Sequence, residues 1–340
     1  TNDEQDFYVA DLMSGDLMII NDDELANDGW AENEEEPCNV TLSGDGLTLA
    51  FDTWDDDVVP SDTNNKRDVF KWQLSPRLPE GDFRWAGATR YDTAIAVSEG
   101  TFPRGADTVV IATGDNWPDA LCGSALAGAV DGPILLTPAA ALPQSVKDEI
   151  DRLGAENAYI LGGTGVVSSA VETELEGMLD GFVNRLAGMT RYTTSQRVAD
   201  RVITLYGNAW DGGALVTTGE NFADALAGAP LAAGVGWPVV LANPVTGDVY
   251  MPEGMDVAVI LGGTGAVPAN VEMALKNSPL SNDDVVRIGG ATRYETAAMA
   301  AEFGVENGLL WNGVGIATGE NFPDGLTGGA SLGLNRTVML

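Results

Sequence analysis

The sequence predicts an α/β fold built from similar parallel-sheet modules in tandem, preceded by a short all-β segment. Three observations support this prediction. Four short motifs recur in a fixed order, about 100 residues apart, from residue 82 on. Within each repeat, apolar β-branched runs alternate with helical stretches, as in sheets covered by helices on both faces. Residues before position 80 show paired short strands instead.

The first 79 residues carry β-strand signals. The stretch VTLSGDGLTLAF at Val40–Phe51 has two alternating apolar runs around Gly-Asp-Gly, which predicts a hairpin. DVFKWQL at Asp68–Leu74 predicts another strand, and TNDEQDFYVADL at Thr1 is echoed by TNNKRDVFKWQL at Thr63. The two similar stretches begin 62 residues apart. Short strands with turn signals that repeat at this spacing predict a β-propeller fragment over residues 1–79.

Each later repeat opens with a helix, ATRYDTAIAVSEG in the first copy. A continuous apolar run at Thr108–Gly114 then predicts a buried parallel strand. Pro118 suits the first position of the helix that follows this strand. Each repeat therefore starts as helix, strand, helix.

The same repeat continues with two more strand and helix pairs. Pro133–Leu136 and AYILGG predict strands. PQSVKDEIDRLG predicts a helix that ends at Gly154, and Ser168 or Ser169 is expected to cap the next helix. The resulting alternation predicts a parallel sheet with helices on both faces.

The chain is strongly acidic. It has 51 acidic and 17 basic residues, a net charge of −34, and 21 of the acidic residues lie in the first 80 positions. This balance disfavours nucleic-acid binding, which needs clustered Lys and Arg. Solubility through self-repulsion and adaptation to high salt both remain open as reasons for it.

Other residue types narrow the chemistry further. Histidine is absent, which excludes His-based triads and His metal ligands from this chain. We expect Cys38 and Cys122 to be unpaired and buried, because they lie in different predicted domains. No apolar run is long enough to cross a bilayer. We expect a piece of a longer protein, since the chain begins with Thr and ends within a repeat.

One loop occurs three times, as ATGDNWPDAL, TTGENFADAL and ATGENFPDGL. In each repeat it follows the carboxyl end of a strand, which is where ligands bind in open α/β sheets. Its asparagines could cap the next helix, and its aspartates would complement the helix dipole. Structural and ligand-facing roles both remain open for these six residues: Asn116, Asn221, Asn321, Asp119, Asp224 and Asp324.

A second glycine-rich stretch, LGGTG, occurs in two repeats. It differs from G-x-G-x-x-G and has no Lys for a P-loop, so nucleotide binding is the weaker interpretation. A tight strand-to-helix turn accounts for these glycines equally well.

The arginines are few and placed at fixed positions. Six of the 13 lie in the R-x-x-G-x-T-R-Y signature, and a tyrosine follows the second arginine each time. A salt bridge, for example to the aspartate of the repeated loop, is one role. Recognition of an anionic ligand by the planar guanidinium is the other. The tyrosines could stack on a sugar or pack in a core. The candidate residues are Arg84, Arg90, Tyr91, Arg185, Arg191, Tyr192, Arg287, Arg293 and Tyr294.

Taken together, these motifs resemble the cell wall binding repeat 2 (CWB2) family. The resemblance covers residues 82–183, 184–284 and 285–340, hereafter the first, second and third modules, the third being truncated relative to the family pattern. It implies Rossmann- or Toprim-like modules that pack together in a pseudo-threefold arrangement. The segment before them is similar to TolB-type WD40-like propellers.

The resemblance also implies a function. CWB2 modules hold exported proteins at the cell wall or surface, often beside an S-layer, by binding an anionic secondary cell wall polymer. No cofactor, metal or catalytic residue is implied for this region. The family's PILL motif is associated with polymer attachment and maps onto Pro133, Ile134, Leu135, Leu136, Pro238, Val239, Val240 and Leu241. Repetition of one site favours binding over catalysis, because tethered weak contacts combine. A nucleotide-dependent α/β enzyme and a purely architectural spacer are the alternatives.

Overall fold

The computed structural model describes the strands at residues 8–10, 17–19, 40–42, 48–53 and 68–73, and then residues 82–340 except 279 and 281–283. The chain divides into two compact units, Thr1–Pro76 and Arg77–Leu340. The expected burial of Cys38 falls outside the described residues.

The first unit contains antiparallel strands. Strand β1 (Tyr8–Ala10) pairs with β2 (Leu17–Ile19), and β3 (Val40–Leu42), β4 (Thr48–Thr53) and β5 (Asp68–Gln73) form a sheet in that order. Val40 is paired with Phe51, so the predicted hairpin is confirmed, as is the strand that begins at Asp68. The propeller assignment stays a prediction.

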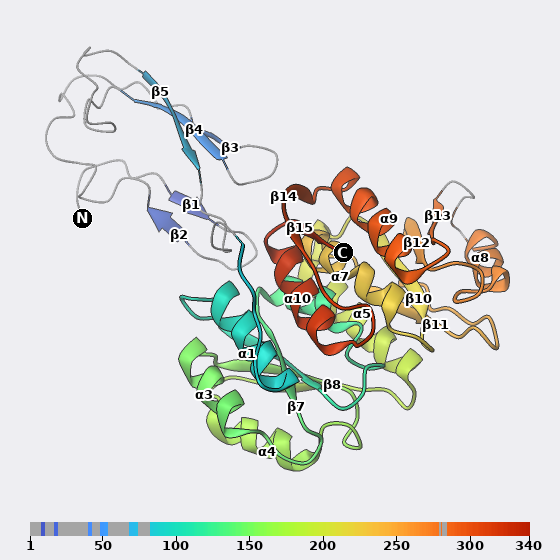
Figure 1. Ribbon diagram of the computed structural model, residues 1–340, viewed down its shortest axis with the longest axis horizontal. Helices are drawn as coiled ribbons and strands as arrows, with labels where there is room; N and C mark the ends of the chain where they lie inside the picture. The colour runs from blue at the N-terminus through green and yellow to red at the C-terminus, as the bar shows by residue number, and fades with distance from the viewer. Residues whose placement is uncertain are drawn as a thin grey trace, which may run out of the picture. The chain divides into compact units, whose positions relative to one another are not determined.

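The second unit is built on parallel sheets (Figure 1). The first sheet has the order β7 (Ile134–Thr137), β6 (Thr108–Thr113), β8 (Asn157–Leu161) and β9 (Val183–Leu186). The second repeats this order with β11 (Val239–Ala242), β10 (Gly213–Thr218), β12 (Val257–Leu261) and β13 (Val285–Ile288). In the third module β14 (Leu310–Gly315) pairs with β15 (Thr337–Met339), also in parallel.

Helices alternate with these strands, as the repeats predict. The first module has α1 (Arg90–Thr101), α2 (Gly123–Val130), α3 (Gln144–Leu153) and α4 (Ser169–Met178). The second has α5 (Arg191–Tyr206), a 3₁₀ turn at Gly207–Ala209, α6 (Ala223–Ala227), α7 (Ala229–Val235) and α8 (Ala269–Lys276). The third has α9 (Arg293–Glu306) and α10 (Pro323–Leu334). In the described part of the chain, none of these helices is long and apolar enough to span a bilayer.

Two predicted helix ends are confirmed and one predicted start is wrong. Gly154 ends α3 in the left-handed conformation (φ 65°), and the hydroxyl of Ser168 accepts from the Val171 N–H at the start of α4. The helix predicted to begin at Pro118 begins instead at Gly123. The Trp117 carbonyl accepts from both Ala120 and Leu121 N–H, and this tight turn delays the helix. At the equivalent position of the third module, α10 does begin with proline.

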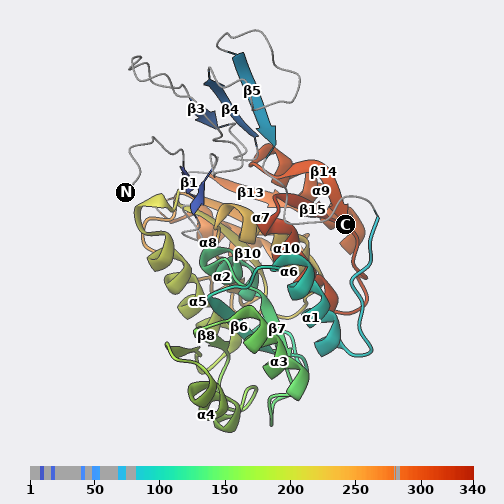
Figure 2. The same cartoon turned by 90° about the vertical axis from the view of Figure 1, so that its left-hand side faces the viewer.

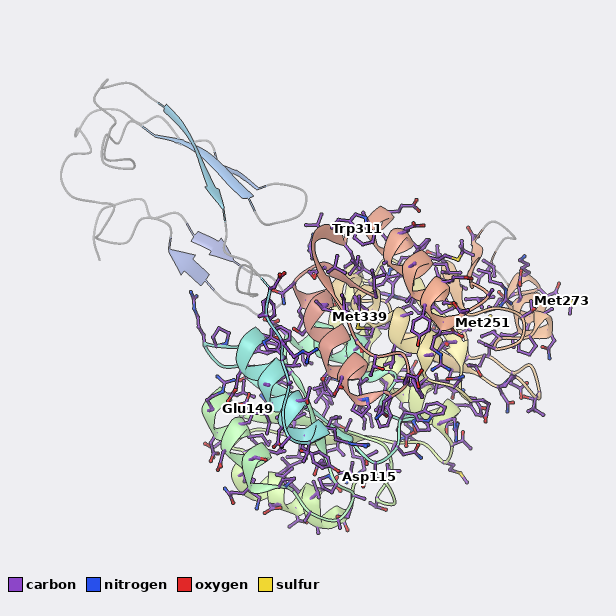
Figure 3. The ribbon with its side chains drawn as sticks, viewed as in Figure 1. Asp115, Glu149, Met251, Met273, Trp311 and Met339 are labelled. Atoms are coloured by element: carbon purple, nitrogen blue, oxygen red, sulfur yellow. The ribbon has the colours of Figure 1, made fainter. Side chains whose placement is uncertain are left out.

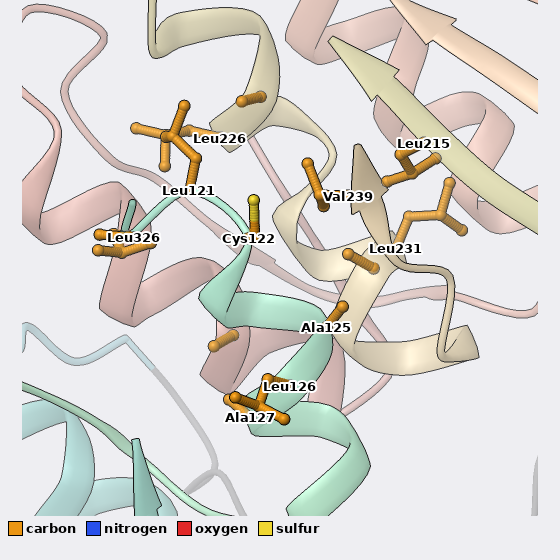
Figure 4. Packing of buried hydrophobic residues seen from close by; sticks show 14 of the residues in the cluster. Leu121, Cys122, Ala125, Leu126, Ala127, Leu215, Leu226, Leu231, Val239 and Leu326 are labelled. Carbon is orange, nitrogen blue, oxygen red and sulfur yellow. The ribbon is translucent and has the colours of Figure 1, made fainter. Parts of the chain in front are cut away.

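Except for β9 and β13, the strands of each four-stranded sheet are buried on both faces, onto which their side chains alternate. In β6, Val109 and Ile111 join a cluster with residues of α3 and α4, while Val110 and Ala112 join a larger cluster with residues of α2. The larger cluster is shared by all three modules. Leu121, Leu226 and Leu326, at equivalent positions, all belong to it (Figure 4).

Three small-residue helices, α2, α7 and α10, pack against one another in this shared core (Figure 2). A Cβ on Gly128 of α2 would lie 2.2 Å from the Ala233 carbonyl oxygen of α7. A Cβ on Gly333 of α10 would lie 2.3 Å from the Pro230 carbonyl oxygen of α7. Glycine is therefore required at both positions for the helix backbones to approach this closely.

The opening helix of each module packs on a helix of another module. Helix α5 packs on α2 of the first module, α9 packs on α6 of the second, and α1 packs on α10 of the third. The contacts thus run in a closed cycle. The boundary predicted between residues 183 and 184 falls within β9, a strand of the first sheet.

Candidate functional site

The second arginine of the repeated signature links two motifs within its own module. Arg90 is the first residue of α1, directly after the N-cap Thr89. Its Nη1 donates a hydrogen bond to the carbonyl oxygen of Gly114, in the repeated loop after β6. Arg191 and Arg293 donate in the same way to Gly219 and Gly319. The R-Y signature and the repeated loop therefore form one structural site in each module.

The same three guanidinium groups lie over aromatic rings of a different module. The Cζ of Arg191 is 5.3 Å from the ring centroid of Trp117. Arg293 lies 5.9 Å from the Phe222 ring, and Arg90 lies 5.8 Å from the Phe322 ring. These are cation–π distances. They follow the same cycle as the helices: second module on first, third on second, first on third.

The three rings also gather in one place. The centroids of Trp117 and Phe222 are 6.2 Å apart, and those of Phe222 and Phe322 are 6.3 Å apart. Both pairs are within the range of favourable aromatic contacts. The repeated loops thus meet in one cluster of three arginines and three aromatic rings, here called the arginine–aromatic cluster. The sequence motif N-[WF]-[PA]-D contains these rings, but the sequence reasoning assigned them no role.

The tyrosines that follow the arginines lie against the same loops. Tyr91 donates to Asp115 at 3.1 Å, and Tyr192 donates to Glu220 at 2.7 Å. Burial, and then the hydrogen bond to Glu220, raise the pKa of Tyr192 to about 12. Asp115 lies at the surface on the loop after β6 (Figure 3), and Tyr294 is 59% exposed. The tyrosines therefore stand at the edge of the cluster, neither in a core nor fully free.

The first arginine of the signature is structural in two modules. Arg185, on β9, donates to the Gly162 carbonyl at 2.8 Å and forms an ion pair with Glu172 at 3.0 Å. Arg287, on β13, donates to the Gly262 carbonyl at 2.7 Å and pairs with Glu272 at 2.9 Å. The expectation of a salt bridge is correct for these two. The partner is a glutamate on the helix that precedes the arginine's own strand, α4 or α8, and not the aspartate of the repeated loop.

These arginines explain the LGGTG turn as well. Their guanidinium groups hold the carbonyl of its first glycine, and Gly162 and Gly262 have φ values of 94° and 114°. The glycines are therefore needed for the backbone turn. Arg84, the equivalent arginine of the first module, is exposed. Within the described residues, no parallel sheet of an earlier module precedes it.

The Glu272 ion pairs should make stability depend on pH. Hydrogen bonds from Lys276 and then Arg287 hold the pKa of Glu272 below its usual value. A carboxyl group with a depressed folded-state pKa stabilises the fold above its unfolded pKa of about 4.3, and this contribution is lost as the pH falls through the folded pKa. We expect Glu272→Gln to cost about 0.5–1 kcal/mol at pH 7 and nothing below that window.

Thermal unfolding from pH 7 to pH 2.5 checks this expectation. Glu302→Gln, at an exposed position on α9, is the control with the same change in charge. Parallel curves for the wild type and Glu272→Gln across the whole pH range would contradict the assigned ion pairs.

The PILL residues lie in the core, and their predicted contact with a ligand stays a prediction. Pro133 and Pro238 are buried and lead into the edge strands β7 and β11. The six aliphatic side chains that follow them, Ile134, Leu135, Leu136, Val239, Val240 and Leu241, are each at most 2% exposed. Side chains so fully packed present no surface to a polymer. The motif stabilises the sheet, since α1 and α5 cover these edge strands.

The polar residues that recur in the repeated loop also have structural roles. The Asn116 side chain accepts from the Trp117 N–H at 3.0 Å, and Asn321 accepts from the Phe322 N–H at 3.0 Å. Asn221 accepts from the Ala223 N–H at 3.3 Å. These bonds order the loop, and the one from Asn221 satisfies the N–H of the first residue of α6. The N-cap position of α10 is held by Phe322, so Asn321 does not cap that helix as predicted. The asparagine shapes the approach to the helix instead.

The aspartates of the loop differ between modules. A Cβ on Gly162 would lie 2.8 Å from an Asp119 carboxylate oxygen, and one on Gly262 would lie 2.7 Å from Asp224. Burial raises the pKa of Asp224, while a hydrogen bond with Thr296 and the charge of Arg293 oppose that rise. Asp224 therefore faces the third module, whereas Asp324 is exposed.

Two Bacillus subtilis (strain 168) proteins are similar to the chain. N-acetylmuramoyl-L-alanine amidase LytC is 31% identical over 250 residues, which cover 72% of this chain and 47% of that protein. The amidase enhancer is 33% identical over 216 residues, which cover 63% of this chain and 28% of that protein. The chain thus spans less than half the length of either relative.

Two solved structures share the fold. Cwp6 from Clostridium difficile matches with a TM-score of 0.66 over 86% of this chain and 50% of that chain, at 20% identity. Cwp8 from the same organism matches with a TM-score of 0.65 over 91% of this chain and 53% of that chain, also at 20% identity.

The family model for cell wall binding domain 2 matches three segments, at residues 84–172, 185–272 and 287–340. These segments contain the arginine–aromatic cluster, and together they make up well over half of the chain. The matched family is one of binding domains, and a nucleotide-dependent enzyme is not favoured for this region. The chain therefore belongs to the cell wall binding domain 2 (CWB2) family, binds the cell wall, and acts at the wall or the cell surface.

Proposed function

We propose that the three CWB2 modules hold the protein at the wall by binding an anionic secondary cell wall polymer at the arginine–aromatic cluster. The observation that carries this proposal is the convergence of Arg90, Arg191 and Arg293. Within the described residues, each uses only Nη1 for hydrogen bonds to the protein, so the Nε and Nη2 donors are left for a ligand.

The chemistry of the cluster suits a phosphate or carboxylate group on a glycan. A planar guanidinium donates to such oxygens through two parallel bonds. The Tyr91, Tyr192 and Tyr294 rings at its edge could stack on sugar faces. The side chain of Arg191 is 32% exposed and that of Tyr294 is more exposed, so a polymer running across the surface can reach both.

The acidic surface opposes an anionic ligand at long range. At physiological ionic strength, charges more than about 8 Å apart are largely screened, and the distance shortens further in stronger salt. The three arginines act at contact distance, where screening is weak. Glu220 lies 3.8 Å from Arg191 and would be the nearest competing carboxylate there.

The geometry argues against one independent weak binding site in each module. Because neighbouring rings of the three loops are 6.2 and 6.3 Å apart, the loops lie too close together to bind well-separated parts of a polymer. We propose one composite site, in which the modules are arranged with pseudo-threefold symmetry around the aromatic rings. The cyclic contacts of the opening helices support this arrangement.

The fragment before the modules is proposed to be part of a β-propeller blade. Its antiparallel order β3-β4-β5 agrees with that architecture. We likewise propose that the protein lies beside an S-layer.

Co-sedimentation with cell walls of the producing organism tests the function. Walls would be used intact and after extraction of their secondary polymers, with the protein kept at equal concentration in both. We expect retention on intact walls and its loss after extraction. Equal retention on both preparations would show that the polymer is not the ligand, and no retention on either would contradict anchoring itself.

A further inference from the structure

The three interfaces between modules can be compared position by position, because the repeats align without gaps within their helices. Leu126 of α2 and Leu231 of α7 occupy the same position in the first and second modules. The third module has Ser331 of α10 there instead. A position that is aliphatic at two interfaces is thus polar at the interface of α10 with α1.

The facing helix shows the same difference. On α1, Ser98 and Thr101 face the third module, and both are 1% exposed. The equivalent residues of α5 are Ala199 and Val202. Those of α9 are Ala301 and Gly304. One more hydroxyl, that of Thr327 on α10, replaces the Cys122 and Ala227 side chains of the other modules.

These hydroxyl groups surround a small cavity between α1 and α10. It has about 10 Å³ of room for the centre of a water molecule, and Ser98, Thr101, Thr327 and Ser331 line it with apolar neighbours. Thr101 and Ser331 lie 2.5 Å apart and share a hydrogen bond. The hydroxyl oxygen of Ser98 is buried and has no hydrogen-bond partner within the described residues.

We infer that one water molecule occupies this cavity and bridges the first and third modules, and that this interface opens before the other two. A cavity of this size holds one water when polar groups are present to bind it. Such a water satisfies the Ser98 hydroxyl, which would otherwise carry an uncompensated desolvation cost. At the other two interfaces, burial of the equivalent apolar side chains stabilises the contact. The hydroxyl groups of the α1–α10 interface provide less of this stabilisation.

The composition of helix α10 also makes its interface with α1 less stable than the other two interfaces. The helix has four glycines in 12 residues, and glycine lowers helix stability relative to alanine. Its partner α1 carries Arg90 at its start, and Phe322 caps α10. Opening of this interface would therefore separate Arg90 from the Phe322 ring. If the cluster is the polymer site, a step that rests on the proposed function, closure of this interface completes it.

Thiol labelling tests which interface opens first, and the chain offers a matched set. In a Cys38→Ser background, native Cys122 reports on the first interface. Adding Cys122→Ala and then Ala227→Cys or Thr327→Cys places the thiol at the equivalent position of the second or third. We expect Thr327→Cys to react at least about tenfold faster than either reference, because buried thiols react only when the structure opens. Equal reactivity at either reference position would overturn the inference.

The direction in which Ser98→Ala changes the unfolding midpoint tests whether a water molecule is bound in the cavity. Ser98→Ala should lower the unfolding midpoint by about 1–2 °C if a water binds that hydroxyl, because the water loses a partner. An unchanged or higher midpoint would mean that Ser98 is an unsatisfied group and would overturn the hydration. Both measurements use the free protein, so neither depends on whether the polymer binds at the cluster.

Discussion

Replacing Arg90, Arg191 and Arg293 together with alanine is expected to abolish retention on intact walls. Each change removes one guanidinium that would pair with an anionic group of the polymer, and hydrogen bonds to charged groups contribute about 1.5–3 kcal/mol apiece. Even the single variant Arg191→Ala should weaken binding by about tenfold or more. Co-sedimentation over a range of protein concentrations measures both effects.

A matched control separates a contact from a general effect of charge. Arg197 lies on the same helix as Arg191, is exposed, and its loss changes the net charge equally. Arg197→Ala should bind as the wild type does. The arginines also pack on rings of neighbouring modules, so each variant must first show an unfolding midpoint close to that of the wild type. Wild-type retention by a folded triple variant would exclude the cluster as the site.

The fold within each module could be predicted because local signals and the repeat agree. The buried run at 108–114, the stop at Gly154 and the cap at Ser168 act over a few residues, and their outcome depends little on distant contacts. The late start of α2 could not be predicted in this way. The proline signal for a start at Pro118 is identical to the one at Pro323, where the helix does begin.

The site was only half visible in the sequence. The arginines stood out because cations are rare in this chain, and the structure brings three of them together. The aromatic rings that they contact could not be recognised in the same way, because an aromatic residue beside a helix start is usually a core residue. That Arg191 meets Trp117, about 70 residues earlier in the chain, depends on how the helices of different modules pack.

The PILL motif is the opposite case, because its burial follows from its sequence while its predicted role in binding stays a prediction. A short apolar run in a parallel sheet is first of all a buried strand. Truncation of the fully buried Leu135 to alanine would leave a cavity and destabilise its module by about 2–5 kcal/mol. Loss of wall binding through such a change therefore reports on folding, whereas the arginine variants report on contact.

The packing of α7 against α10 leads to the second large expected effect. Gly333→Ala should lower stability by about 3 kcal/mol and the unfolding midpoint by roughly 6–10 °C. The new Cβ would stand 2.3 Å from the Pro230 carbonyl oxygen and 2.7 Å from the Ala233 Cβ. Neither atom belongs to a flexible side chain, so the two helices must move apart.

Gly328→Ala is the control on the same helix. Nothing lies within 4 Å of a Cβ at Gly328, and its backbone is not in the left-handed region. Alanine there should raise stability by up to about 1 kcal/mol, through its higher helix propensity. Calorimetric unfolding of both variants distinguishes the two effects of one substitution. If both variants were stabilised, α10 would not pack on α7 as closely as the structure shows, and the shared core that brings the three arginines together would lose its support.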